Sequence, residues 1–140
     1  MREGKGELRG CRGSPTPSQP DLVAETWRSA LAAAFGDPRF QAVKHGDLAD
    51  LQISVSVLGK LERVNSPREL DPAYYGVVVL ADDGRKGLLL PGIEGIDRVD
   101  DQLHRARTKA GIELDEPVTI QRFTTRCYEE APPAAMGDQR

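Results

Sequence analysis

The strongest constraint on the fold is a β-hairpin signal in the middle of the chain. Residues 76–81 form an apolar, largely β-branched run, the turn sequence Asp-Asp-Gly follows at 82–84, and residues 87–90 are apolar again. An Asp-Gly pair between two apolar runs is typical of a tight turn between antiparallel strands. The chain is therefore predicted to build a sheet around this hairpin.

A first helix is predicted ahead of the hairpin. It starts near residues 20–21 with Ser18 as its N-cap, and Gly36 ends it. Its apolar residues cover a wide arc of its surface, which indicates a helix packed on more than one side. These residues are Leu22, Val23, Trp27, Ala30, Leu31, Ala33 and Ala34.

Further elements complete the pattern. Strands are predicted at residues 7–12, at 51–58 or 51–64, and at 118–127. A short helical turn is expected at Ser66-Pro67, and a second helix runs from a cap at Asp97 through about Ala110, with Gly111 as its stop. The order predicts an α+β fold: a mixed or antiparallel sheet of about five strands, including the central hairpin, with two main helices packed on it.

Size and charge narrow the function classes. A chain of 140 residues suits one domain, predicted at 1–130 with a disordered tail at 131–140. A net charge of −3 argues against a general nucleic-acid binder. No run approaches the length of a membrane helix and the polar start is no secretory signal, so a cytoplasmic protein with no membrane contact is expected. Thiols stay reduced there, which favours unpaired Cys11 and Cys127.

The segment Leu8–Ser14 carries the main chemical signal, because it places Cys11 between two glycines and two arginines. Cations beside a cysteine favour the thiolate, which is the nucleophilic form. Glycine lets the backbone approach a ligand closely. Cys11 is therefore predicted to be a nucleophile or covalent carrier. The alternative is a small buried strand residue, since free cysteine is often buried.

The same segment predicts an anion or substrate site. Guanidinium groups bind carboxylate and phosphate, and backbone amides between glycines add donors. The predicted contributors are Arg9, Gly10, Arg12, Gly13 and Ser14. The alternative is a pair of solvated or ion-paired arginines beside a serine that shapes a turn.

The general base for Cys11 stays open between His45 and His104, because no spacing selects either. No metal-ligand spacing and no cofactor motif occurs, so no metal or cofactor site is predicted. Asp37 and Arg39 follow the first helix and are predicted to form a cap and an ion pair.

Six segments, in order, resemble one known family. They are Leu-Arg-Gly-Cys-Arg-Gly-Ser at 8–14, residues 33–40 ending in Asp-Pro-Arg-Phe, Ile-Ser-Val-Ser-Val-Leu at 53–58, Gly-Val-Val-Val at 76–79, Gly-Leu-Leu-Leu-Pro at 87–91, and Lys-Ala-Gly at 109–111. Together they resemble the AMMECR1 domain family, protein A of the AmmeMemoRadiSam system. Arg12 stands where that family carries isoleucine, and such a side chain must face outward or pair with an acid.

The resemblance implies a place in a multi-step modification pathway, with a Memo-like protein and a radical SAM protein as partners. Any cofactor chemistry would then belong to those partners. It also implies a largely helical segment ahead of residue 8 that is short in this sequence. Two further interpretations stay open: a non-catalytic adaptor that binds partners through the motif surface, and a shortened remnant that folds poorly. The oligomeric state is not predicted.

Overall fold

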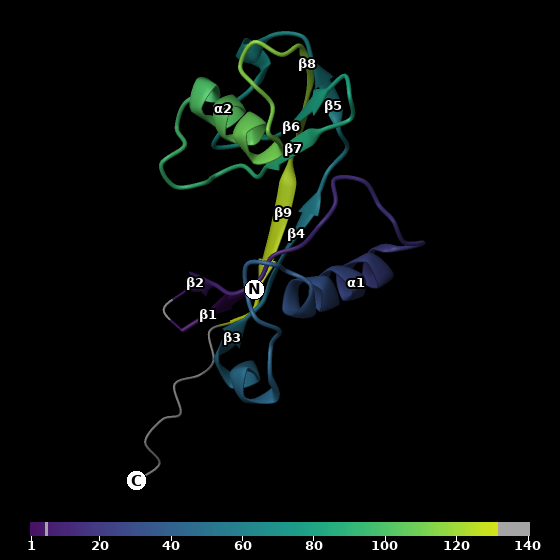
Figure 1. Cartoon of the computed structure of the whole chain (residues 1–140), viewed down its shortest axis with the longest axis vertical. Coiled ribbons are helices and arrows are strands. Elements are labelled where there is room, and N and C mark those ends of the chain that lie inside the picture. The colour runs from purple at the N-terminus through teal and green to yellow at the C-terminus, as the bar shows by residue number, and fades with distance from the viewer. Residues whose placement is uncertain (5, 132–140) are drawn as a thin grey trace. The chain divides into compact units, whose positions relative to one another are not determined.

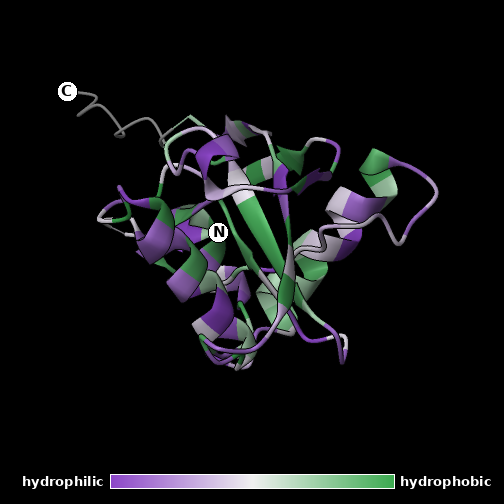
Figure 2. Ribbon diagram, turned by 90° about the horizontal axis from the view of Figure 1, so that it is seen from above, coloured by the Kyte–Doolittle hydropathy of each residue, from purple (hydrophilic) through white to green (hydrophobic). Residues whose placement is uncertain are grey.

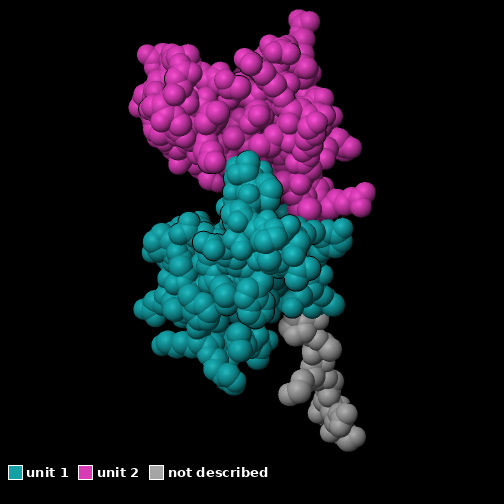
Figure 3. All heavy atoms as spheres, turned by 90° about the vertical axis from the view of Figure 1, so that its right-hand side faces the viewer, with its two compact units in different colours: residues 1–56, 127–140 teal, residues 57–126 magenta. Residues whose placement is uncertain are grey.

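The computed structural model describes residues 1–4 and 6–131, and the chain divides into two compact units. Unit 1 holds residues 1–56 and 127–140, and unit 2 holds residues 57–126 (Figure 3). The predicted disordered tail lies outside the described residues except for Ala131. The single domain expected over 1–130 stays a prediction.

Unit 2 is built on a four-stranded antiparallel sheet (Figure 1). Its strand order is β5-β8-β6-β7, with β5 at Glu62–Val64, β6 at Gly76–Ala81, β7 at Lys86–Leu89 and β8 at Val118–Phe123. The predicted hairpin is confirmed as β6 and β7, which pair Val77 with Leu89 and Val79 with Gly87. The expected helical turn is confirmed as η2 (Pro67–Glu69), with Ser66 as its N-cap.

Helix α2 (Val99–Ala110) packs on this sheet and closes an apolar core. Val64, Ile120 and Val79 occupy one row of the ladder, and paired residues point to the same face of a sheet. Gly87 is the last residue of that row, opposite Val79. Only glycine fits there, because a Cβ would lie 1.9 Å from the carbonyl oxygen of Ala106 on α2. The core is therefore assembled from alternate residues of four strands and one face of the helix.

Unit 1 combines a small sheet with one long helix. Strands β1 (Arg2–Glu3), β2 (Glu7–Leu8) and β3 (Leu51–Gln52) pair in the order β2-β1-β3, and α1 spans Leu22–Phe35. A 3₁₀ helix, η1, covers His45–Asp50. Strands β4 (Ser54–Leu58) and β9 (Thr125–Glu129) pair with each other, and the division between the units falls within both.

Helix α1 departs from the sequence prediction in two ways. Its N-cap is Asp21, whose carboxylate accepts the amide of Ala24, whereas the backbone N–H of Ser18 donates to Glu25. The large apolar side chains of α1 are exposed, so packing on more than one side was wrong for the described residues. Both helices carry hydrophobic and hydrophilic residues along their length (Figure 2).

Several predicted strands are shorter than expected. The strand at 7–12 ends at Leu8 because the amide of Cys11 bonds a side chain instead of a neighbouring strand. The strand at 118–127 divides at Thr124, whose carbonyl accepts the amide of Gly59. The stretch 51–64 likewise divides into β3, β4 and β5. The second helix begins after Arg98, so Asp97 is not its cap.

The predicted α+β class is confirmed, and α2 packs on the antiparallel sheet of unit 2. The stop of α2 at Gly111 is confirmed as well, because this glycine has a left-handed φ of 65° that favours glycine. Among residues 1–4 and 6–131, no helix has the length and apolar character needed to span a membrane.

Candidate functional site

The Cys11 segment leaves β2 at Leu8 and lies against the C-terminal part of α1. A Cβ at Gly10 would lie 2.3 Å from the carbonyl oxygen of Ala33, closer than real side chains approach. Glycine is therefore required at position 10 for the backbone to reach the helix. The guanidinium of Arg12 donates to the carbonyl oxygen of Gly36 at 2.9 Å, which fixes the segment to the end of the same helix.

Asp37 holds the Cys11 backbone in place. Its side chain is buried, with 6% of the residue exposed, and Oδ2 accepts the backbone N–H of Cys11 at 3.0 Å. The guanidinium of Arg39 donates two hydrogen bonds to the same carboxylate, from Nε to Oδ1 at 3.0 Å and from Nη2 to Oδ2 at 2.7 Å. These side-chain bonds from Arg39, followed by the N–H groups of Cys11 and Arg39, lower the pKa of Asp37 far below its usual range against the effect of burial. The buried carboxylate of Asp37 is stable here because the groups that bond it are all hydrogen-bond donors.

The side chain of Cys11 faces outward from this fixed backbone. Cys11 is exposed and its thiol is free. Arg39 adds a cation nearby, because it bonds the same carboxylate that accepts the Cys11 amide, and that bond raises the pKa of its guanidinium. The buried-strand alternative for Cys11 does not describe this exposed position.

The sequence interpretation of Asp37 and Arg39 was incomplete. Their ion pair is confirmed at 2.7 Å. Their role as the support of Cys11 was missed, because it depends on a contact between residues 26 positions apart. The Asp-Pro-Arg-Phe segment shared with the resembling family was the signal that could have indicated it.

The predicted anion ligands do not all point to one place. Arg9 bonds residues of unit 1. Its guanidinium donates to the carbonyl oxygen of Gln41 at 2.7 Å, and it forms ion pairs with Glu3 at 3.3 Å and with Asp47 at 3.4 Å. Only 14% of its side chain is exposed. Arg12 is exposed and faces outward, as the sequence requires. The exposed cation that shares the Cys11 segment is therefore Arg12.

The small residues of the motif play different parts. The amide of Gly10 donates to the carbonyl oxygen of Met1 at 3.4 Å, a long bond. Gly13 and Ser14 are exposed. The hydroxyl of Ser14 accepts the amide of Thr16 at 3.3 Å, which is turn geometry. The anion-binding role of these residues stays a prediction.

The candidate bases and the second cysteine lie in separate elements. His45 begins η1 in unit 1, His104 lies on α2 in unit 2, and both are exposed. Neither histidine side chain bonds Cys11 in the described structure. Cys127 is a free, exposed thiol on β9. Within residues 1–4 and 6–131, no three His, Cys, Asp or Glu side chains are grouped so that they could hold a metal ion.

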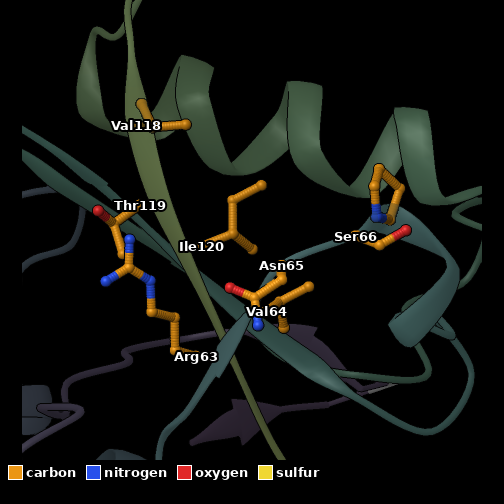
Figure 4. Close-up of a pocket in the computed structure, with 8 residues that line it drawn as sticks. Arg63, Val64, Asn65, Ser66, Val118, Thr119 and Ile120 are labelled. Carbon is orange, nitrogen blue, oxygen red and sulfur yellow. The ribbon is translucent and has the colours of Figure 1, made fainter.

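Unit 2 contains a hollow of about 270 Å³ at the edge of its sheet (Figure 4). Strand β8 extends there beyond the end of β5, because the ladder between them stops at Val64 and Ile120. The lining residues are Arg63, Val64, Asn65, Ser66, Pro67, Val118, Thr119 and Ile120. None of these is a cysteine, histidine or carboxylate, so this hollow lacks a strong nucleophile and an ordinary base.

Comparison with known proteins decides the family. Residues 1–128 match the AMMECR1 family. The chain belongs to this family. A protein of Thermotoga maritima is 47% identical over 125 residues, covering 89% of this chain and 71% of that protein. Protein CA_C1420 of Clostridium acetobutylicum is 40% identical over 126 residues, covering 90% of this chain and 26% of that protein.

A solved structure supports the same AMMECR1 fold. The crystal structure of uncharacterized protein PH0010 from Pyrococcus horikoshii matches with a TM-score of 0.81 and 34% sequence identity. The match covers 89% of this chain and 66% of that one. The shared region therefore spans only part of each relative, and it leaves out a third or more of the relative's length in two of the three cases.

Proposed function

We propose that this AMMECR1 protein acts through the Cys11 thiol, as a nucleophile or covalent carrier in a multi-step modification pathway. The observation that carries the proposal is the bond from the Cys11 amide to the buried carboxylate of Asp37, combined with an exposed sulfur. A fixed backbone with an accessible side chain is what a nucleophile needs, because orientation lowers the cost of reaching the reactive geometry.

The charges around Cys11 favour this chemistry. Arg12 follows Cys11 in the chain, and Arg39 bonds the carboxylate that accepts the Cys11 amide, so two exposed cations would attract an anionic substrate to this segment. In the proposed reaction the thiolate attacks an electrophilic centre, a covalent bond to sulfur forms, and the substrate's leaving group departs. Arg12, with Gly13 and Ser14 beside it, would position an anionic group of the substrate.

The wider setting belongs to the same proposal. We infer a Memo-like protein and a radical SAM protein as partners, in the cytoplasm, where a free thiol stays reduced. This chain would supply the thiol, and its partners would supply redox or metal chemistry.

Alkylation tests the proposal within one molecule, because Cys127 is a matched exposed thiol. Iodoacetamide at neutral pH is expected to modify Cys11 at least several times faster than Cys127, as measured by peptide mass spectrometry over time. Arg12→Gln is expected to reduce that difference without affecting Cys127. A Cys11 thiol that resists alkylation while Cys127 reacts would contradict an activated nucleophile.

A second candidate function is an adaptor that binds the same partners without chemistry. The observation that favours it is the engagement of Arg9 with Glu3 and Asp47, which removes one predicted substrate ligand. Cys11→Ala separates the two functions. An enzyme would lose activity while keeping its fold and partner binding, whereas an adaptor would keep its function.

A further inference from the structure

The hollow in unit 2 exists because the chain turns away from β8 after Val64. The backbone N–H groups of Asn65 and Ser66 both donate to the carboxylate of Glu69, at 2.9 Å each, and not to β8. The ladder between β5 and β8 therefore stops at the pair of Val64 and Ile120. The hydrogen bonds of the turn fix one wall of the hollow, and β8 forms the other (Figure 4).

The open edge of β8 is only two residues long. Val118 and Thr119 pair with β6, and no described strand pairs with them on the β5 side. Successive residues of an antiparallel strand direct their N–H and C=O groups to opposite neighbours, so one of the two directs both groups into the opening. Pro117 precedes them and has no N–H, so an added peptide strand would find little to bond. This edge suits a small molecule better than a peptide.

The two faces of the hollow differ in chemistry. The apolar lining residues belong to the core of unit 2 or pack against it, and they are Val64, Val118 and Ile120. Side chains alternate along a strand, so Thr119 and Arg63 lie on the opposite face. Asn65 would be the next partner of Thr119 if the ladder continued, and it also lines the hollow. A cation, an amide and a hydroxyl therefore lie beside an apolar wall.

Arg63 gives the hollow its charge, because it is the one ionisable residue among the eight that line it. Its side chain is exposed. The nearby carboxylates have other partners: Glu62 pairs with Arg122 at 3.2 Å, and Glu69 accepts the two amides of the turn. In the part of the chain that the structure describes, no carboxylate forms an ion pair with Arg63. The hollow thus carries one positive charge that the lining does not balance.

We propose that this hollow binds a small monocarboxylate with a short aliphatic chain. The planar guanidinium of Arg63 matches a carboxylate with two parallel hydrogen bonds, and the Asn65 amide and Thr119 hydroxyl supply further donors. One carboxylate balances one guanidinium, whereas a phosphate dianion would keep an unbalanced negative charge. The aliphatic chain would contact Val118 and Ile120.

The size of the hollow supports a small ligand. Its volume of about 270 Å³ lies just below the range of about 300–1,000 Å³ for sites of drug-sized molecules. Because the hollow contains neither a strong nucleophile nor an ordinary base, its role is binding and not a second reaction. The proposal does not depend on the chemistry of Cys11, which lies in the other unit.

Isovalerate is the probe, because it joins one carboxylate to a branched aliphatic chain. It is added to the full chain, and two-dimensional nuclear magnetic resonance follows the backbone amides. The expected shifts are confined to the amides of residues 63–66 and 118–120, with a dissociation constant of about 1 mM for a molecule of this size. Isovaleramide has the same shape without the charge, and it is expected to bind about tenfold more weakly or less tightly still.

Arg63→Gln is the test variant, because it removes the charge from an exposed side chain. It is expected to raise the dissociation constant of isovalerate by about tenfold or more. Arg68→Gln is the matched control: Arg68 is an exposed arginine on η2 in the same unit and does not line the hollow. It changes the net charge equally and is expected to leave binding unchanged. Far-ultraviolet circular dichroism checks both folds.

Four results would overturn the proposal. Isovalerate that shifts none of these amides would show that the hollow does not take a carboxylate. Equal binding of isovaleramide would remove the role of charge, and tighter binding of inorganic phosphate at the same amides would assign the site to another anion. Equal weakening by Arg63→Gln and Arg68→Gln would trace the effect to net charge alone. The three probes on the unmodified chain decide the first three results even if a variant does not fold.

Discussion

In both units a glycine allows close packing between a helix and an extended segment, but the residues around this contact differ. In each, a glycine lies beneath the carbonyl oxygen of a helical alanine: Gly10 under Ala33 in unit 1, and Gly87 under Ala106 in unit 2. In unit 2 this contact is one part of an apolar core that includes Val79. In unit 1, Ala33 is the one apolar residue that is buried among those described.

The difference indicates how each unit is stabilised. Burial of apolar surface stabilises unit 2 without a directional requirement. Unit 1 depends instead on polar contacts, above all the carboxylate of Asp37 with the Cys11 amide and the Arg39 guanidinium. Directional contacts fix the position of a reactive group better than they stabilise a fold. The candidate site therefore lies in the unit that has the smaller core.

The largest expected effect is on the core of unit 2. Leu89→Ala removes a side chain that is almost fully buried in the sheet, so a loss of about 3 kcal/mol is expected. Hydrogen exchange should then speed up by about 100-fold for the amides of β6, β7 and α2. Amides of unit 1 should change much less. Equal acceleration in both units would contradict the separate origins of their stability.

The next largest effect is expected at the contact between glycine and helix in unit 1. Gly10→Ala forces a methyl group against the Ala33 carbonyl and should destabilise unit 1 by about 2 kcal/mol. Gly13→Ala is the matched control, because a Cβ there meets open space. It should change stability by less than about 0.5 kcal/mol. Urea unfolding measures both, and equal effects at the two positions would refute the close approach.

The polar support of unit 1 should respond to pH. The pKa of Asp37 is lowered by folding, so its contribution to stability is fully present above its ordinary value of 3.8 and is lost as the pH falls further. The protection factors of the amides at 9–12, which are corrected for the intrinsic pH dependence of exchange, should therefore fall below about pH 4. Asp37→Asn should remove this dependence. A pH response that survives Asp37→Asn would assign it to another group.

The smallest effect concerns the start of α1. Asp21→Ala removes the N-cap and should cost about 1 kcal/mol. Ser18→Ala, at the cap that the sequence indicated, should cost less than about 0.5 kcal/mol because the Ser18 amide keeps its bond to Glu25. Thermal unfolding of the two variants compares them, and a larger loss for Ser18→Ala would reverse the assignment.

The sequence predicted the elements that local signals define. The hairpin at 76–90 needs an Asp-Gly turn and two apolar runs, and α2 needs apolar spacing and a stop at Gly111. Both are short-range patterns. The fixed contacts of unit 1 are long-range: Asp37 and Cys11 are 26 positions apart, and the Arg9 guanidinium pairs with Asp47, 38 positions away. No local pattern specifies which partner such groups find.

The strand boundaries that were predicted wrongly also depend on long-range contacts. Thr124 continues a strand pattern, but its carbonyl bonds Gly59 and β8 ends one residue earlier. Apolar spacing also could not show which side of α1 faces inward. Small residues such as Ala33 pack against Gly10, and the larger Trp27 stays outside.

The most direct measurement is the exchange rate of the Cys11 amide hydrogen, followed by nuclear magnetic resonance in the full chain. Cys11 is exposed and lies outside any helix or strand, so without Asp37 its amide would exchange with water freely. Because this amide donates to a buried carboxylate, it is expected to be protected, and Asp37→Ala should remove the protection. Free exchange of the Cys11 amide in the unmodified chain would contradict a fixed Cys11 backbone.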